Sequence, residues 1–114
     1  KLATIFNEKG YEKIAYKFHP DYYEKKDVLN KYRSLLKDAF GHNIKEIEPN
    51  ILLESYIITC KADFYSDRSS VGFYVSKYGI KNYSYYNLIK GISNNYDEIQ
   101  KPGLELFEKC SIML

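Results

Sequence analysis

The residues whose side chains are most capable of chemistry lie in the segment 51–65, where Tyr56 and Cys60 fall on one face of a predicted strand. A cysteine reacts as its thiolate, and a thiolate forms readily only beside a base or a positive charge. No base neighbours Cys60 in the sequence, and Asp63 alternates onto the opposite face, where it is expected to point to solvent. We therefore interpret Tyr56 and Cys60 as core or pocket residues, not as a nucleophile and its proton donor.

The remaining motifs assign no reaction to this chain. Two cysteines, Cys60 and Cys110, and two histidines, His19 and His42, do not have the spacing of a zinc site. The sequence contains no glycine-rich phosphate loop and no serine in a nucleophile setting. We expect no metal, no cofactor and no catalytic residue. If the fold encloses a pocket, we expect it to be lined by Tyr56, Cys60, Phe64 and Phe73.

The two cysteines leave two redox states open. They are compatible with one disulfide in an oxidising compartment or with two buried thiols in a reducing one. A bridge would close a loop of about 50 residues and pin the C-terminal segment, with a stabilisation of roughly 4 kcal/mol in the loop-entropy model. Sequence does not show whether the two Cα atoms approach within the roughly 7 Å that a disulfide requires.

Composition indicates a single folded domain of 114 residues, of which 45% are hydrophobic. The net charge is +2, from 17 basic and 15 acidic residues, which is too balanced for a nucleic-acid partner. The chain begins at Lys1 without methionine, so we expect either a signal peptide or lipid anchor upstream or a trimmed chain. A signal peptide or lipid anchor predicts an extracytoplasmic or membrane-anchored protein. A cytoplasmic protein is the alternative.

A well-specified amphipathic helix is predicted near the start. Asp21 and Glu24 have the spacing of a capping box, and Gly41 stands where a terminating glycine belongs. Between them, apolar residues recur at helical spacing at Val28, Leu29, Tyr32, Leu35, Leu36, Ala39 and Phe40. This pattern predicts a helix over residues 23–40 that buries Leu35, Leu36 and Phe40 against a sheet. A weaker helical pattern over residues 11–18 ends before Pro20.

The residue pattern of the second half predicts β-structure. Strict alternation over residues 51–65 predicts a long half-buried strand, because successive side chains of a strand point to opposite faces. Its core face is expected to carry Tyr56, Ile58, Cys60, Ala62 and Phe64, and its outer face Thr59, Lys61 and Asp63. A polar turn at 66–70 leads to predicted strands at 71–75 and from 80 to 88 or 92, joined as antiparallel hairpins. His42 to Pro49 suggests a short strand or turn around Ile44 and Ile47.

These elements together predict an α+β fold in one domain, residues 1–114. Its helical part is 1–41, its sheet is 44–92 and its tail is 93–114. Two N-terminal helices would pack on a curved antiparallel sheet, and Leu104, Phe107 and Ile112 could form a short C-terminal helix.

One resemblance covers residues 3–92. Gly10–Ile14, His19–Tyr23, Ala39–Gly41, Ile44–Ile47 and the predicted hairpin Val71–Tyr83 follow one another in an order that resembles the small nuclear transport factor 2-like domains of bacterial exported proteins and lipoproteins. The resemblance implies a cone-shaped sheet wrapped around helices. Members of that superfamily serve as ligand binders, assembly modules or enzymes with a cone-shaped pocket, so the resemblance implies a fold more than a function.

A second, shorter resemblance covers Tyr11–Asp21, which is similar to the second helix and the His-Pro-Asp loop of J-domain co-chaperones. Lys31–Leu35 stands where the third helix of that family begins. By this resemblance His19, Pro20 and Asp21 would bind and stimulate a DnaK-type chaperone. Local physics offers a plainer interpretation, in which Pro20 ends one helix, Asp21 caps the next and His19 is structural or at the surface.

The sequence thus favours a non-enzymatic, exported domain that binds a ligand or takes part in assembly. Its partner would be a protein or a small ligand, and a homodimer is compatible with the pattern. A J-domain-like co-chaperone is the first alternative and a small enzyme with a cone-shaped pocket is the second.

Overall fold

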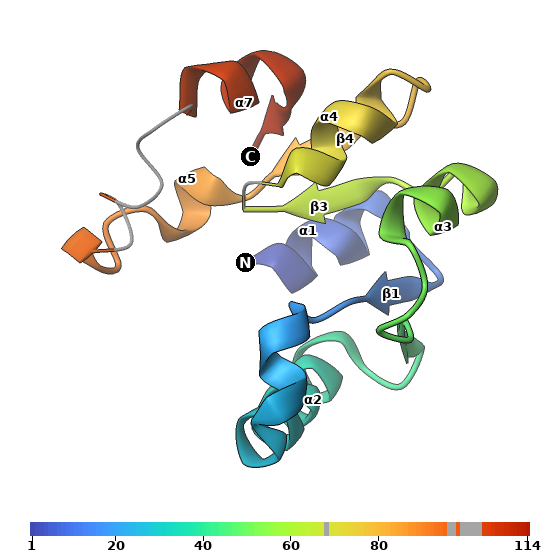
Figure 1. Ribbon diagram of the computed structural model, residues 1–114, viewed down its shortest axis with the longest axis vertical. Coiled ribbons are helices and arrows are strands. Elements are labelled where there is room, and N and C mark those ends of the chain that lie inside the picture. The colour runs from blue at the N-terminus through green and yellow to red at the C-terminus, as the bar shows by residue number, and fades with distance from the viewer. Residues whose placement is uncertain (68, 96–97, 99–103) are drawn as a thin grey trace. The chain divides into compact units, whose positions relative to one another are not determined.

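The computed structural model describes residues 1–67, 69–95, 98 and 104–114. Contacts divide the chain into two compact units, Lys1–Ile51 and Leu52–Leu114. Within each unit, short strands pair side by side and helices connect them (Figure 1). Every strand pair in the described residues is parallel, so the predicted curved antiparallel sheet is wrong. The fold remains α+β in content, but with two small parallel sheets.

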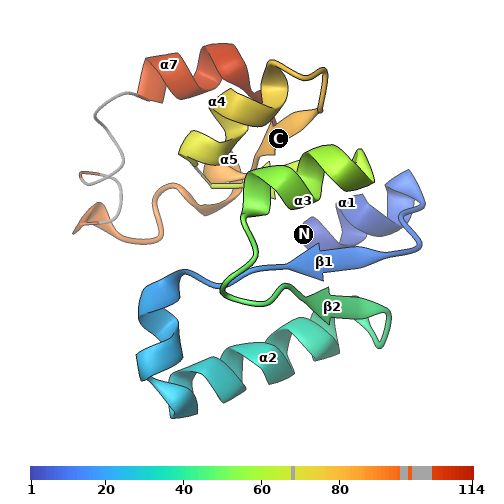
Figure 2. The same cartoon turned by 45° about the vertical axis from the view of Figure 1, so that its right-hand side comes forward.

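The first unit is a strand–helix–strand arrangement preceded by a helix. Its elements are α1 (Leu2–Lys9), β1 (Ile14–Tyr16), the 3-10 helix η1 (Pro20–Glu24), α2 (Lys26–Phe40) and β2 (Ile44–Glu46). Strand β1 pairs with β2 so that Tyr16 lies opposite Glu46. Parallel neighbours need a crossover connection, and η1 and α2 supply it, with α2 lying along the strand pair (Figure 2). The short strand or turn expected near Ile44 is strand β2.

Helix α1 lies earlier than the weaker predicted helix. It ends at Gly10, which adopts a left-handed φ of 72° that glycine tolerates at little cost. The buried Phe6 packs its ring 5.5 Å from Tyr11 and 5.4 Å from Phe40. Residues 14–16, predicted to be helical, are strand β1 instead.

Helix α2 ends as predicted but begins differently. His19, not Asp21, provides the cap of η1, because its Nδ1 accepts a hydrogen bond of 3.3 Å from the backbone N–H of Asp21. Pro20 occupies the first position of η1, where its missing N–H is no loss. Helix α2 then starts at Lys26, so the predicted capping box is wrong, while the helix end beside Gly41 is confirmed.

The buried face of α2 also differs from the prediction. Leu29 is the buried residue, 3% exposed, whereas Leu35 is 52% exposed. Leu36 and Phe40 are half-buried. A pair of three-residue strands offers little surface to cover, so only a narrow stripe of the helix is shielded.

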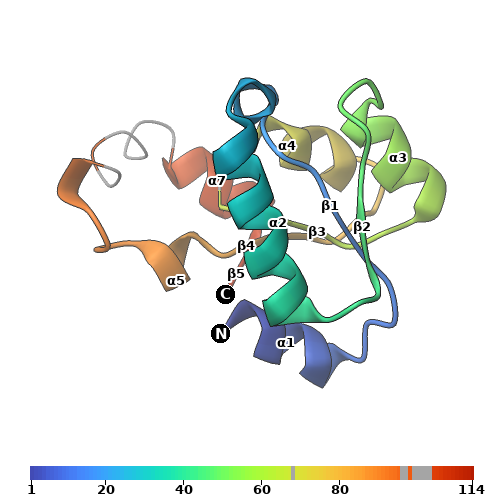
Figure 3. The ribbon, with the colours of Figure 1, turned by 90° about the horizontal axis from the view of Figure 1, so that it is seen from below.

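The second unit is a three-stranded parallel sheet with helices between its strands. Its elements are α3 (Leu53–Cys60), β3 (Phe64–Ser66), α4 (Ser70–Ser76), β4 (Asn82–Ser84), α5 (Tyr86–Ile89), α7 (Leu104–Cys110) and β5 (Ile112–Met113). The strands lie in the order β3-β4-β5 (Figure 1 and Figure 3). The predicted short C-terminal helix corresponds to α7, although Ile112 belongs to β5. The side chain of Phe107 lies outside the described part of the chain.

Most of the long strand predicted over 51–65 is helix α3, which is the largest error of the sequence analysis. Leu53, Tyr56, Ile57 and Cys60 recur at positions i, i+3, i+4 and i+7, which is helical spacing. Ile57, which was not among the predicted core residues, is 3% exposed, while Cys60, assigned to the core face, is exposed. The predicted strand faces therefore do not exist over this stretch.

Helix α4 replaces the predicted strand at 71–75. It packs on β4 through Gly72, where an added Cβ would lie 2.7 Å from the side-chain Cγ of Asn82. Val75, on the same helix, is fully buried. The strand expected from residue 80 onward is confined to β4, all three residues of which are buried.

Strand β4 is the centre of the second unit. The Tyr83 ring stacks on that of Tyr65 in β3, with centroids 4.6 Å apart. On the other side, the Asn82 amide donates to the Cys110 carbonyl at 3.1 Å and to Ser111 Oγ at 3.0 Å, which ties down the C-terminal strand. Cys60 and Cys110 are both free thiols in the structure.

Candidate functional site

Parallel strands place their carboxyl ends at one edge of a sheet, and ligands of open α/β sheets bind at that edge. In the first unit, β1 and β2 end at the register partners Tyr16 and Glu46. In the second, β3 and β4 end at the register partners Ser66 and Ser84. The side chains that follow these four strand ends are therefore the candidates for a ligand site.

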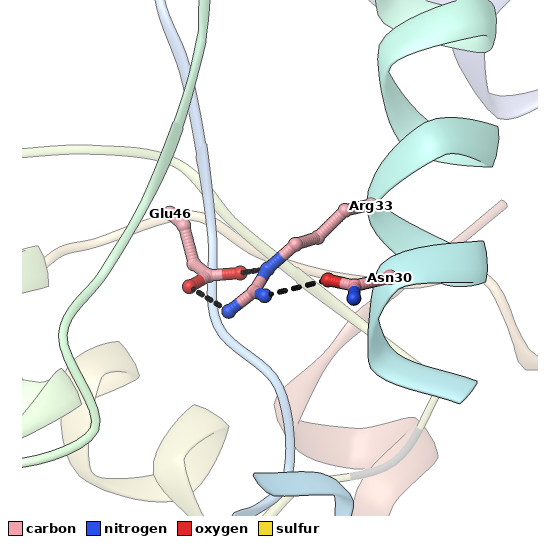
Figure 4. A network of polar contacts seen from close by, with 3 residues as sticks. All are labelled: Asn30, Arg33 and Glu46. Carbon is pink, nitrogen blue, oxygen red and sulfur yellow. Dashed lines mark hydrogen bonds and ion pairs between the residues drawn. The ribbon is translucent and has the colours of Figure 1, made fainter. Parts of the chain in front are cut away.

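A polar network joins the end of β2 to helix α2 (Figure 4). The Arg33 guanidinium donates to both carboxylate oxygens of Glu46, from Nε at 2.7 Å and from Nη2 at 2.9 Å. Its Nη1 donates to Asn30 Oδ1 at 3.1 Å. Forked contacts of this kind fix geometry as well as charge, so the network aligns α2 with the end of the strand pair.

Two tyrosines complete this cluster. Burial raises the pKa of Tyr16, and a hydrogen bond and charge from Glu46 raise it further, while Arg33 acts in the opposite direction. Burial also raises the pKa of Tyr23, again with a contribution from Glu46. The Tyr23 hydroxyl is buried and has no hydrogen-bond partner among the described residues. Because this hydroxyl is closed off, we interpret the cluster as a positioning element and not as a ligand site.

The segment after β1 carries His19, Pro20 and Asp21 at the surface. The imidazole Nδ1 lies 3.3 Å from Asp21 Oδ2, and the two side chains are 67% and 86% exposed. In a J-domain this triplet follows a long helix, whereas here it follows the strand β1. The structure thus lacks the helical hairpin that the co-chaperone resemblance requires, and the cap made by His19 gives it a local structural role.

The segment after β3 is rich in serine and approaches the end of β4. Ser84 Oγ donates to the Asp67 carbonyl at 2.6 Å and accepts from the Tyr86 N–H at 3.3 Å. Ser69 Oγ accepts from the Val71 N–H at 3.2 Å and so caps α4. Ser70, the next residue, is exposed. These contacts hold the carboxyl ends of β3 and β4 together in one polar surface.

Tyr85 lies against this surface. Burial raises the pKa of its hydroxyl, and the nearby Asp67 carboxylate raises it further, while the Asp67 backbone hydrogen bond acts in the opposite direction. Tyr85 therefore stays protonated at neutral pH, as a neutral hydroxyl beside the end of the sheet.

The residues predicted to line a pocket are distributed over three elements. Tyr56 and Cys60 belong to α3, Phe64 begins β3 and Phe73 lies in α4. Cys60 is exposed and the other three are half-buried. None of them lines the hollow of about 360 Å³ in the second unit, which is formed by Ile58, Lys61, Asp63, Tyr78, Gly79, Ile80 and Lys81.

The serine-rich segment 66–70 is visible in the sequence, where it reads as a polar turn. The sequence did not reveal that strand β3 is followed by a helix, α4, and not by a second strand. The glycine at position 72 was the available signal, because glycine allows a helix to approach a sheet closely.

Within the described residues, no three or more His, Cys, Asp or Glu side chains gather in a way that could hold a metal ion. Over the same part of the chain, no helix has the length and apolar character needed to cross a membrane.

Comparisons with protein-family models, with curated proteins and with solved structures find no match to this chain.

Proposed function

We propose that this protein is a small-molecule binding domain that takes a nucleotide or a comparable phosphorylated ligand at the carboxyl ends of β3 and β4. The proposal keeps the ligand-binding function expected from the sequence, but moves it from a cone-shaped pocket to the edge of a parallel sheet. Sheets built from strand–helix–strand units bind mononucleotides at this edge in many α/β proteins.

One observation carries the proposal: helix α4 begins shortly after β3 ends and packs closely on β4. Ser66, Asp67, Ser69 and Ser70 are the described residues between them, and Gly72 brings α4 against Asn82 of β4 with no room for a Cβ. In dinucleotide-binding turns a glycine has the same packing role. Here serine hydroxyls stand where those turns carry glycines, and hydroxyls can donate hydrogen bonds to phosphate oxygens.

The exposed Ser70 is the best residue for a test, because Ser69 also caps α4 and its loss would weaken the helix. The four nucleoside monophosphates and inorganic phosphate would be titrated against the whole chain by calorimetry. We expect at least one nucleotide to bind, and Ser70→Ala to weaken its binding about five- to twentyfold, which corresponds to roughly 1–1.8 kcal/mol for one hydrogen bond to phosphate at an exposed site.

Ser55→Ala is the matched control, because Ser55 is an exposed serine of α3, an element that does not contribute to this edge. Its affinity should equal that of the unmodified chain. If no nucleotide binds at millimolar concentration, or if Ser70→Ala and Ser55→Ala behave alike, the proposal fails. Sedimentation of the same samples tests the assembly function, which predicts self-association without ligand.

An extracytoplasmic location remains part of the proposal. Fractionation of cells that make the native protein tests it directly, and recovery in the cytoplasm alone would reject it.

A further inference from the structure

We propose that the hollow beside helix α3 is a second, separate binding site for a small amphipathic carboxylate, meaning one apolar ring or chain that bears a single acid group. The hollow has a volume of about 360 Å³. It lies at the amino ends of the strands, since Asp63 precedes β3 and Lys81 precedes β4. It is therefore at the edge opposite to the proposed nucleotide site and does not depend on it.

Lys61 is the first reason to regard the hollow as functional. Helix α3 ends in a Schellman motif, in which the Ala62 N–H donates to the Ile57 carbonyl at 3.1 Å and the Lys61 N–H donates to the Ile58 carbonyl at 3.3 Å. The motif requires a left-handed residue, and Lys61 has a φ of 50°. Among the described residues it is the only non-glycine with positive φ.

Glycine or asparagine would adopt this conformation at lower cost. Strained backbone positions of this kind cluster at functional sites. Lys61 lines the hollow, so its ammonium group is one of the positive charges that this site would offer to a ligand.

The lining of the hollow defines the ligand. Ile58 and Ile80 provide apolar surface, and the 68% exposed Tyr78 offers a ring for stacking. The two lysines, Lys61 and Lys81, outnumber the one acid, Asp63, by a single positive charge. An apolar body with one negative charge satisfies both features, and the volume suits a ligand of one ring near the lower limit of ordinary pockets.

Benzoate is a suitable probe, and benzamide is its neutral counterpart of nearly the same shape. Each would be titrated into the ¹⁵N-labelled chain while backbone amide shifts are followed by NMR. We expect benzoate to shift the amides of residues 58–61 and 78–81, and benzamide to bind about two- to fivefold more weakly, the range for an exposed ion pair.

Two lysine variants separate the roles of charge and backbone. Lys81→Gln should weaken benzoate binding about two- to fivefold, and Lys90→Gln, an exposed lysine outside the hollow, should not change it. Lys61→Gly should weaken benzoate binding by a similar factor and leave the melting temperature unchanged or higher, because glycine removes the strain.

A merely structural Lys61 predicts the reverse for that variant, namely a lower melting temperature and unchanged binding. The proposal is also overturned if 20 mM benzoate shifts no amide of the hollow, or if benzamide binds as well as benzoate.

Discussion

The ion pair between Arg33 and Glu46 fixes the position of helix α2 in the first unit. The pair is bidentate, yet the two side chains are 38% and 25% exposed, so solvent screens much of its charge interaction. Its main effect is therefore geometric, because it sets where α2 lies against the end of β2. Neither the pairing nor the register with Tyr16 is visible in the sequence, since the partners lie 13 residues apart on a helix and a strand.

A double-mutant cycle tests this pair. Arg33→Gln and Glu46→Gln should each destabilise the chain, and the double variant should lose less stability than the two single losses together. Urea denaturation of the four proteins provides the comparison. Strictly additive losses would show that the two side chains do not interact.

Tyr85 predicts a dependence of stability on alkaline pH. Its pKa is raised in the folded protein, chiefly by burial, so the folded state holds the phenolic proton more tightly than the unfolded state. The resulting stabilisation is complete below the unfolded pKa of about 10 and is lost as pH rises through the folded value. Tyr85→Phe should therefore flatten the fall of the unfolding free energy above about pH 10. An unchanged alkaline slope would contradict the assignment.

At the scale of elements, local sequence signals identified one helix end and one short strand, but no strand partner. The end of α2 at Gly41 and the short strand β2 follow from local signals. Helix α3 does not, because Leu53–Cys60 satisfies both the two-residue period of a strand and the spacing of a helix. The parallel strand pairs could not be predicted either, because β1 and β2 are about 30 residues apart in the sequence and are not joined by a local turn.

Helix α2 offers a matched pair of leucines. Leu29→Ala should cost about 2–4 kcal/mol of unfolding free energy, because a buried side chain is lost and a cavity remains. Leu35→Ala, at a position 52% exposed, should cost under about 1 kcal/mol. Denaturant unfolding measures both values. Equal costs would mean that the helix presents a different face to the strands.

Gly72 tests the packing of α4 on β4. Gly72→Ala places a methyl group against the Asn82 side chain, which cannot retreat without breaking its bonds to Cys110 and Ser111. We expect a loss of about 1–3 kcal/mol from overpacking, despite the better helix propensity of alanine. Ser70→Ala, at an exposed position of the same helix, is the control. A stabilised Gly72→Ala variant would exclude this close contact.

On the scale of the whole molecule, the α+β content could be predicted from the sequence, but the two units and the direction of their strands could not. That difference changes the function that is inferred. An antiparallel cone encloses a ligand between sheet and helices, whereas a parallel sheet presents its ligand site at the carboxyl ends of its strands. The candidate pocket residues were chosen for an antiparallel cone, whereas the serine-rich segment lies where a parallel sheet would bind its ligand.

A chemical-shift map of the ¹⁵N-labelled chain, titrated with the tightest-binding nucleoside monophosphate, tests this account most directly. We predict that the largest amide shifts fall on Ser66, Asp67, Ser69 and Ser70, with smaller ones at Ser84 and Tyr85, which meet the same edge. Largest shifts at the amino ends of the strands, around Asp63 and Lys81, or no shift at any amide, would contradict it.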